Sequence, residues 1–304
     1  EVRYQVRGHI GYDKPMTNLG SLLPLMSAVK QKDGADPNIY YHAFIDIGCP
    51  VVGCGSYGVA GIALVAGSGE NAGNSRVAAS VFWTSKSGSI SRTTDTFVHE
   101  VGHNQGLAHV ACAGLEAASP DPNYPYEGGK IGEWGFGIRN FTIHNPSSSH
   151  DYMTYCGNSW GSDWTFLKTY NRIRTLTSWD FGAAQQASPE SEEWVMGEEL
   201  VIGALYPDGS EEWFTLAGGI DVEDIAPSET LAFELGGQEF EQPTVIQTLS
   251  DGETKWVIAP LPEGAELAAV DQITHRRDGV VRRVITQDEI VKDLVGGTDI
   301  LSPF

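Results

Sequence analysis

Residues 97–112, FVHEVGHNQGLAHVAC, contain three histidines and a glutamate within a short stretch. The pattern around them predicts a helix, and His99 and His103 then lie at positions i and i+4. Such positions share one helix face, so both imidazoles can reach one metal ion. Glu100 follows the first histidine and is displaced around the helix, where it can reach a metal-bound water instead of the ion.

Gly106 stands where this helix is expected to end, and it allows the backbone angles that a sharp exit needs. The exit brings His109 back toward the first two histidines as a third ligand. Three protein ligands leave one coordination position open, which is the pattern of a catalytic zinc site. HExxHxxGxxH fixes five positions and is expected by chance on the order of once per million windows.

The sequence resembles the metzincin clan of zinc metalloproteases, and within it the secreted bacterial members. The resemblance rests on His99, Glu100, His103, Gly106 and His109, and on a Met-turn at Met153 in HDYMTYCG. It implies a secreted zinc endopeptidase that hydrolyses peptide bonds of proteins and glycoproteins, with Glu100 as general base for a zinc-activated water. It also implies that Met153 lies beneath the zinc, and that Tyr155 ligates zinc, stabilises the oxyanion or packs under the site.

The resemblance covers residues 1–182 and implies an α/β (α+β) catalytic domain with a mixed sheet and an active-site helix. The segment patterns agree with this class. They predict strands at 2–12, 38–48, 59–67 and 76–83, and helices at 18–31, 89–105 and 163–179. The clan fold places an edge strand along the cleft, and we expect Gly61, Ile62, Ala63 and Leu64 to bind an extended peptide there.

Charge divides the chain near residue 183. Residues 1–182 hold 15 acidic and 13 basic side chains, a net of −2, and residues 183–304 hold the other 25 acidic and 6 basic, a net of −19. The acidic part argues against nucleic acid and anionic membranes as partners. Short β-like runs separated by turn residues predict a small β-sandwich-like domain over 183–304, with a hairpin at 273–285 around Asp278-Gly279. Calcium binding is open, but no motif indicates it.

The cysteines are four, and their even number without a C-x-x-C pair predicts two disulfides and an oxidising compartment. Four cysteines allow three pairings. If the Met-turn adjoins the zinc site, Cys112 and Cys156 are neighbours, and a disulfide between them is favoured over zinc ligation. Cys49–Cys54 would then close a short loop. No apolar run is long enough to span a bilayer, and the chain begins at Glu1 without Met, so we expect a processed, secreted monomer.

The long irregular region before the Met-turn contains Trp134, His144 and His150. Trp134 is a candidate for the substrate-pocket wall, where it would suit a glycoprotein, or else for the core. We expect the two histidines on the surface. Two other functions stay open: a binding or adhesion module with a vestigial zinc site, against which the intact Glu100 argues, and a hydrolase of non-peptide amides.

Overall fold

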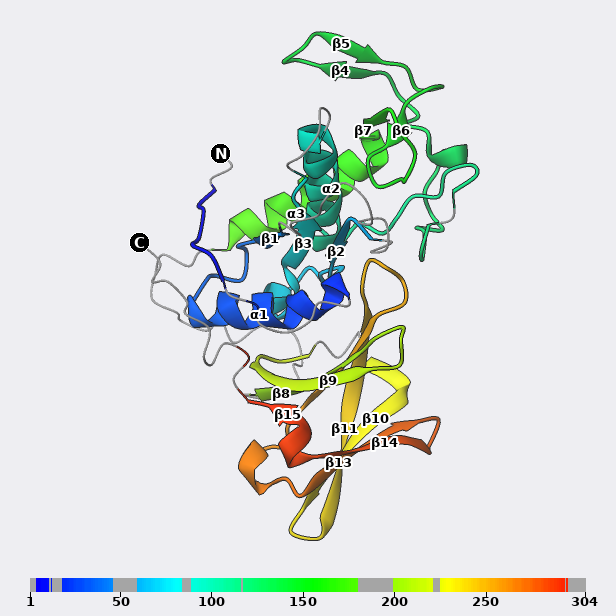
Figure 1. Cartoon of the computed structure of the whole chain (residues 1–304). Coiled ribbons are helices and arrows are strands. Elements are labelled where there is room, and N and C mark those ends of the chain that lie inside the picture. Colours follow the sequence, from blue (N-terminus) through cyan, green and yellow to red (C-terminus); the bar gives the residue numbers. More distant parts are fainter. Residues whose placement is uncertain are drawn as a thin grey trace.

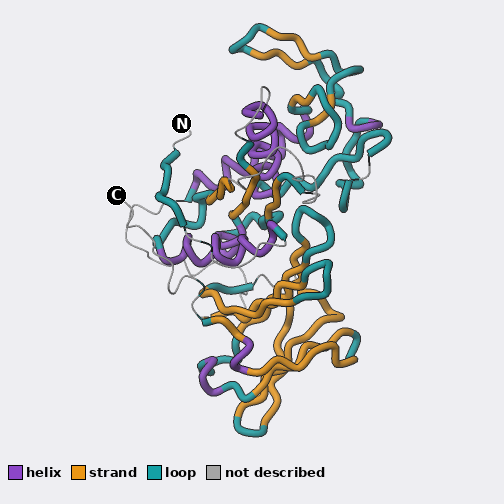
Figure 2. Tube along the Cα trace, in the orientation of Figure 1, coloured by secondary structure: helices purple, strands orange, loops and turns teal. Residues whose placement is uncertain are grey.

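A computed structural model describes residues 4–10, 12, 18–45, 59–83, 89–115, 117–179, 199–220, 225–292 and 294. Figure 1 shows helices around a small sheet in one part of the molecule and a β-domain in the other. Figure 2 shows the same division, with most of the helices and the long loops in the first part and most of the strands in the second. This arrangement confirms the predicted order of an α/β region followed by an all-β region.

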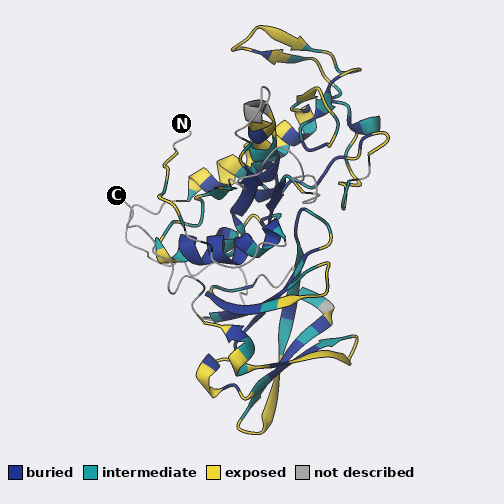
Figure 3. Ribbon diagram, in the orientation of Figure 1, coloured by how far each residue is buried: buried dark blue, intermediate teal, exposed yellow. Residues whose placement is uncertain are grey.

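The first part is built on a three-stranded mixed sheet of order β1-β3-β2. β1 (Tyr41–Ile45) runs parallel to β3 (Val77–Val81), and β2 (Gly61–Ala63) runs antiparallel to β3. β3 is buried along its whole length, as Figure 3 shows for the centre of this part. β2 is an edge strand, so one row of its backbone groups is left for other partners.

Three α-helices pack around this sheet. α1 (Leu22–Lys32) follows a short 3-10 helix, η1 (Leu19–Ser21), and shares a core with the side chains of β3 that point to its face. α2 (Ser89–Asn104) packs against β2 and β3, and α3 (Asp163–Ser178) begins at the side-chain cap of Ser162. Pro24 lies in the first turn of α1, where proline is tolerated, so it does not distort the helix.

The connections of this part carry only short elements. The 3-10 helices are η3 (Asn71–Ser75) and η4 (Glu127–Gly129). The short strands are β4 (Gly135–Gly137), β5 (Thr142–His144), β6 (His150–Asp151) and β7 (Ser159–Trp160). β4 and β5 form an antiparallel hairpin that projects from the molecule (Figure 1).

The β-domain is one eight-stranded sheet of order β14-β13-β10-β11-β12-β8-β9-β15, curled into a nearly closed barrel. Its strands are β8 (Glu199–Leu205), β9 (Glu211–Ala217), β10 (Ile225–Leu235), β11 (Gln238–Thr248), β12 (Lys255–Pro260), β13 (Gln272–Arg277), β14 (Val280–Thr286) and β15 (Ile290–Val291). The 3-10 helices η6 (Leu267–Ala269) and η7 (Gln287–Glu289) complete it. All-β structure is confirmed, although the strands join in one continuous sheet where two packed sheets were expected.

The predicted hairpin at 273–285 is β13–β14. Asp278 and Gly279 have φ of 51° and 72°, the positive values that a type I′ turn requires. Arginines of the hairpin pair with carboxylates: Arg276 with Glu239 at 2.7 Å, and Arg277 with Glu229. The basic cluster therefore serves the acidic sheet itself.

The two parts share one hydrophobic core. Leu23 of α1 and Ile62 of β2 belong to the same buried cluster as Ile202, Phe214 and Trp256 of the β-domain. Phe214 and Trp256 meet edge to face with ring centroids 5.5 Å apart. The expected boundary between 182 and 183 lies outside the described residues, but this shared core joins the catalytic part to the β-domain as a packed unit.

Two sequence predictions are wrong. Residues 4–10 form no strand because they pair with no neighbouring strand, and Tyr4 and Val6 are 91% and 71% exposed. One of the short β-like runs of the sequence, residues 265–273, contains the 3-10 helix η6 instead, and β13 begins only at Gln272. The proposed Cys49–Cys54 disulfide falls outside the described residues.

Candidate metal centre and active site

The three histidines of the motif come together at the end of α2. His99 and His103 lie one turn apart on the helix, and His109 reaches them from the loop that follows. One nitrogen of each ring lies within 4.8 Å of the other two, and all three side chains are buried. His144 and His150 lie outside this group. His144 stacks on Trp160, and His150 contacts Lys130.

Backbone carbonyls fix the orientation of all three rings. Nδ1 of His99 donates to the carbonyl of Tyr152 at 2.9 Å, that of His103 to Leu107 at 2.7 Å, and that of His109 to Ala118 at 2.6 Å. A ring that donates from Nδ1 presents a lone pair at Nε2, the arrangement of metal-binding histidines.

The Nε2 atoms of His99 and His103 are buried and have no hydrogen-bond partner in the described part of the chain. Unpartnered buried acceptors are costly, and a zinc ion would satisfy them. Burial lowers the pKa of His99 to about 4 and the pKa of His103 well below its usual value. Both rings are therefore neutral near pH 7, as ligation requires. The residues present fit zinc.

Gly106 has φ of +82°, which confirms the expected left-handed exit from the helix. The N–H of Gly106 donates to the carbonyl of His103 at 2.8 Å, and the N–H of Leu107 to that of Gly102 at 3.1 Å. These bonds close the helix end and turn the chain back, which brings His109 to the other two ligands.

Glu100 is 4% exposed and lies between α2 and the sheet edge. A Cβ on Gly61 would stand 2.6 Å from Glu100 Cγ, so the side chain fits only because residue 61 is glycine. Burial raises the pKa of Glu100 to about 8, opposed by a hydrogen bond from Ser250, whose Oγ lies 3.3 Å from Oε2. The side chain is thus held in an apolar setting beside the metal ligands.

Met153 lies directly under the helix that carries the ligands. It is fully buried, its carbonyl accepts from Val110 N–H at 2.9 Å, and a Cβ on Gly102 would stand 2.4 Å from its sulfur. A disulfide joins Cys112 to Cys156, as predicted. The ligand loop and the Met-turn are therefore tied covalently and by backbone bonding.

Tyr155 places its hydroxyl 2.9 Å from Nε2 of His109. Its ring stacks on His99, with centroids 5.7 Å apart. Burial raises the pKa of Tyr155 to about 12, so the hydroxyl stays protonated and can donate a hydrogen bond. Trp134, in contrast, is 65% exposed, which rules out a core role for it.

Two residues at the site were not foreseen. Asn104, one turn after Glu100, donates from Nδ2 to the carbonyls of Leu64 at 3.0 Å and Val77 at 2.9 Å, and so fixes α2 to the sheet. The helical i, i+4 spacing from Glu100 was a signal that could have found it. Ser250 lies 150 residues from Glu100, and only a turn pattern marks it in the sequence.

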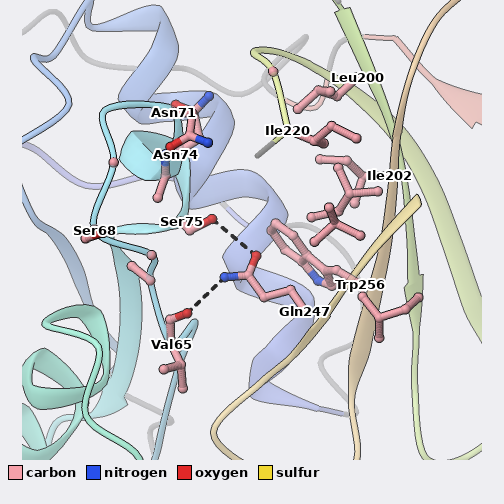
Figure 4. A pocket seen from close by; sticks show the side chains of 18 of the residues that line it. Val65, Ser68, Asn71, Asn74, Ser75, Leu200, Ile202, Ile220, Gln247 and Trp256 are labelled. Atoms are coloured by element: carbon pink, nitrogen blue, oxygen red, sulfur yellow. Dashed lines mark hydrogen bonds between the residues drawn. The ribbon is translucent and has the colours of Figure 1, made fainter. Parts of the chain in front are cut away.

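A separate cavity of about 510 Å³ lies where the two parts meet. Figure 4 shows Leu200, Ile202, Ile220 and Trp256 on its β-domain side and Asn71, Asn74 and Ser75 on the other. Its lining includes Gly106 but none of the three histidines and not Glu100. This space belongs to the interface between the parts and not to the metal centre.

In comparisons with known proteins, the profiles of two peptidase families match overlapping stretches of the chain. The profile described as "Metallo-peptidase family M12B Reprolysin-like" matches residues 16–110, and the profile "Peptidase M66" matches residues 84–192. Dictomallein-5 of Dictyostelium discoideum is 41% identical over 68 residues, a segment that is 22% of this chain and 10% of that protein. No solved structure matches the chain. Among the described residues, no helix has the length and apolar character needed to cross a membrane.

Proposed function

This chain contains a zinc metallopeptidase domain of the metzincin type, and we propose that it is a secreted endopeptidase that cuts proteins, glycoproteins included. One observation carries the proposal: two buried Nε2 atoms that have no hydrogen-bond partner among the described residues lie beside a buried carboxylate on the same helix. Ring nitrogens of His99, His103 and His109 also lie within 4.8 Å of one another, so one metal ion could contact all three.

The Nε2 atoms of His99, His103 and His109 would hold the zinc. A bound zinc ion would act as a Lewis acid that lowers the pKa of water toward ~7 and polarises a peptide carbonyl. Nδ1 of each ring keeps its backbone bond during this, so the ligands need no reorientation.

Glu100 would take the proton from the attacking water and pass it to the leaving amine. Burial raises the pKa of Glu100, and the positive charge of a zinc ion held beside it would lower that pKa again, so that the carboxylate could accept the proton. Tyr155 would lose its contact with His109 if that ring held the metal, and its protonated hydroxyl would then be free to donate to the developing oxyanion.

An extended peptide would add to the outer edge of β2, the edge that does not pair with β3. Ile62 pairs with Ala79 of β3, and the backbone of the flanking Gly61 and Ala63 faces the other way. Main-chain hydrogen bonds at this edge would hold the scissile bond beside Glu100. The exposed ring of Trp134, next to Gly135, supports glycoprotein substrates because it can stack on a sugar. The Cys112–Cys156 disulfide supports an oxidising, extracellular location.

Digestion of casein and of a glycosylated protein by the wild type and by Glu100→Gln tests the proposal. We expect the wild type to cut and a chelator to stop it, and we expect Glu100→Gln to lose roughly 10²- to 10⁴-fold in kcat/KM while keeping its zinc. Binding of these proteins without cutting would favour the vestigial-site alternative. Equal activity of wild type and variant would refute the role of Glu100.

A further inference from the structure

The turn between β11 and β12, residues 249–254, reaches from the β-domain to the metal centre. Figure 1 shows it rising from β11 toward β2. We call these residues the hairpin tip. The tip is well ordered by its own bonds: Asp251 Oδ1 accepts from the N–H of Glu253 at 3.0 Å and of Thr254 at 2.9 Å, and Gly252 N–H donates to Leu249 at 2.9 Å.

The tip pairs with the edge strand that a peptide would use. Ser250 N–H donates to the carbonyl of Ala63 at 3.0 Å, and Ala63 N–H donates to Ser250 Oγ at 2.9 Å. Leu64 and Leu249 form an antiparallel bridge in the same register. The N–H and the C=O of Ala63, which both face away from β3, are therefore already hydrogen-bonded. The segment that bonds them runs antiparallel to β2, as a strand added at this edge can.

The pairing continues beyond the tip. Gln247 donates from Nε2 to the carbonyl of Val65 at 3.2 Å and accepts from Ser75 Oγ at 3.2 Å, as Figure 4 shows. Residues 247–250 thus run along residues 63–65, and the contact is a docked segment of chain instead of a single touching side chain.

The tip also reaches the general base. Ser250 Oγ accepts from Ala63 N–H, which leaves its own hydrogen for the carboxylate of Glu100 at 3.3 Å. With the tip in place, Glu100 is 4% exposed. The hydroxyl of Ser250 therefore binds the carboxylate oxygen of Glu100 that would otherwise contact the attacking water.

On the far side, the tip meets the loop that orients the third histidine. A Cβ on Gly252 would stand 2.4 Å from the Cβ of Ala118, whose carbonyl accepts from His109 Nδ1. The tip therefore extends from the edge strand, past Glu100, to the opposite wall of the site.

We infer that the hairpin tip occupies the peptide-binding edge in place of substrate, so that the β-domain inhibits the peptidase until the tip moves away. The inference rests on the proposed function, because it takes β2 as the edge that binds peptide. Substrate and tip compete for the same N–H and C=O of Ala63 and for the space beside Glu100.

Gly252→Ala tests this with a matched control in the same domain. The added methyl would push the tip off Ala118, whereas Gly209→Ala changes another Asp-Gly turn of similar positive φ, +83° against +74°, with no atom within 4 Å. We expect kcat/KM on a quenched fluorescent peptide to rise roughly tenfold for Gly252→Ala, the worth of about one net hydrogen bond, and to stay unchanged for Gly209→Ala. Equal or lower activity of Gly252→Ala relative to Gly209→Ala would overturn the inference.

A reversible engineered disulfide distinguishes the effect of the hairpin tip on activity from a folding defect. Residues 65 and 248 lie opposite each other in the register of the Leu64–Leu249 bridge, so Val65→Cys with Thr248→Cys can form a disulfide across the pairing. We expect the oxidised double variant to be inactive and to regain activity on mild reduction, with the wild type treated alike as control. Full activity of the oxidised form would overturn the inference. If Glu100→Gln abolishes activity while the tip variants behave as wild type, only the inference fails and the proposed function stands.

Discussion

Two buried histidine sites, one in each part of the molecule, differ in how their nitrogens are satisfied. In the β-domain, His275 Nε2 lies 2.6 Å from Glu229 Oε2, and the other oxygen of Glu229 binds Arg277. In the first part, the Nε2 atoms of His99 and His103 have no partner among the described residues.

Burial by itself therefore does not identify a functional histidine. An unpartnered buried polar atom costs about 1–3 kcal/mol, and a ligand that binds the atom offsets that cost. The His275 site is complete without any addition and joins β10 to β13. The triad is incomplete, and what it lacks is a cation that accepts three nitrogen lone pairs.

Removal of one triad histidine gives the largest expected effect. His103→Ala should lose its bound zinc and all measurable proteolysis, because two nitrogens cannot hold the ion against water. Zinc content by atomic absorption and the zinc-dependent rise in Tm would report this. His275→Ala is the control and should keep both; its loss of zinc would erase the distinction between the two sites.

The disulfide comes next. It closes a loop with a sequence separation of 44 between the third ligand and the Met-turn, and loss of such a loop constraint costs about 4 kcal/mol. The double variant Cys112→Ser, Cys156→Ser should have a free energy of unfolding lower by about that amount, and chemical denaturation measures it. Unchanged stability would mean that backbone bonding alone ties the two segments.

His275→Ala should cost less, about 1–3 kcal/mol, because it leaves a buried carboxylate oxygen of Glu229 without its partner while Arg277 stays paired. Urea unfolding of the metal-free protein is the measurement. His103→Ala leaves no partner unsatisfied at Nε2 and takes a hydrogen-bond donor only from the neutral carbonyl of Leu107, so it should cost the metal-free protein less. A larger destabilisation by His103→Ala than by His275→Ala would reverse the comparison.

A partly buried histidine of β1, His42, gives an effect that appears only as the pH falls. Burial lowers the pKa of His42, beside Phe44 and Phe97, to about 3. Between the unfolded value of ~6.5 and about 3, only the unfolded chain gains the proton, so stability falls with acidification by up to about 1.4 kcal/mol per pH unit. His42→Gln should flatten the unfolding free energy between pH ~6 and ~4; parallel curves would contradict the assignment.

The metal centre could be predicted from the sequence because local geometry builds it. The helix period sets His99 against His103, and a single glycine returns His109. The mixed sheet followed from the family resemblance that these motifs carry, and the Cys112–Cys156 pair from the expected place of the Met-turn beside the zinc site. These features depend on residues close in sequence or on a turn whose place beneath the site is fixed.

The tertiary contacts could not be predicted. Nothing in the pattern around Ser250 distinguishes it from other turn residues, and its contact with Glu100 exists only because two sheets share a core. The strand expected at 2–12 is absent from residues 4–10 because strand formation also depends on distant partners. Its residues favour extended structure, but no neighbouring strand among the described residues offers them an edge. Whether a barrel or a sandwich forms is likewise decided by pairing between distant strands.

The docked hairpin tip has a consequence for the solubility of the first part. An uncovered strand edge is a template on which another chain can add and begin aggregation. Because residues 247–250 cover the β2 edge from Ala63 to Val65, the acidic β-domain shields that template in each molecule. Its charge of −19 over residues 183–304 then keeps the shielded molecules apart in solution.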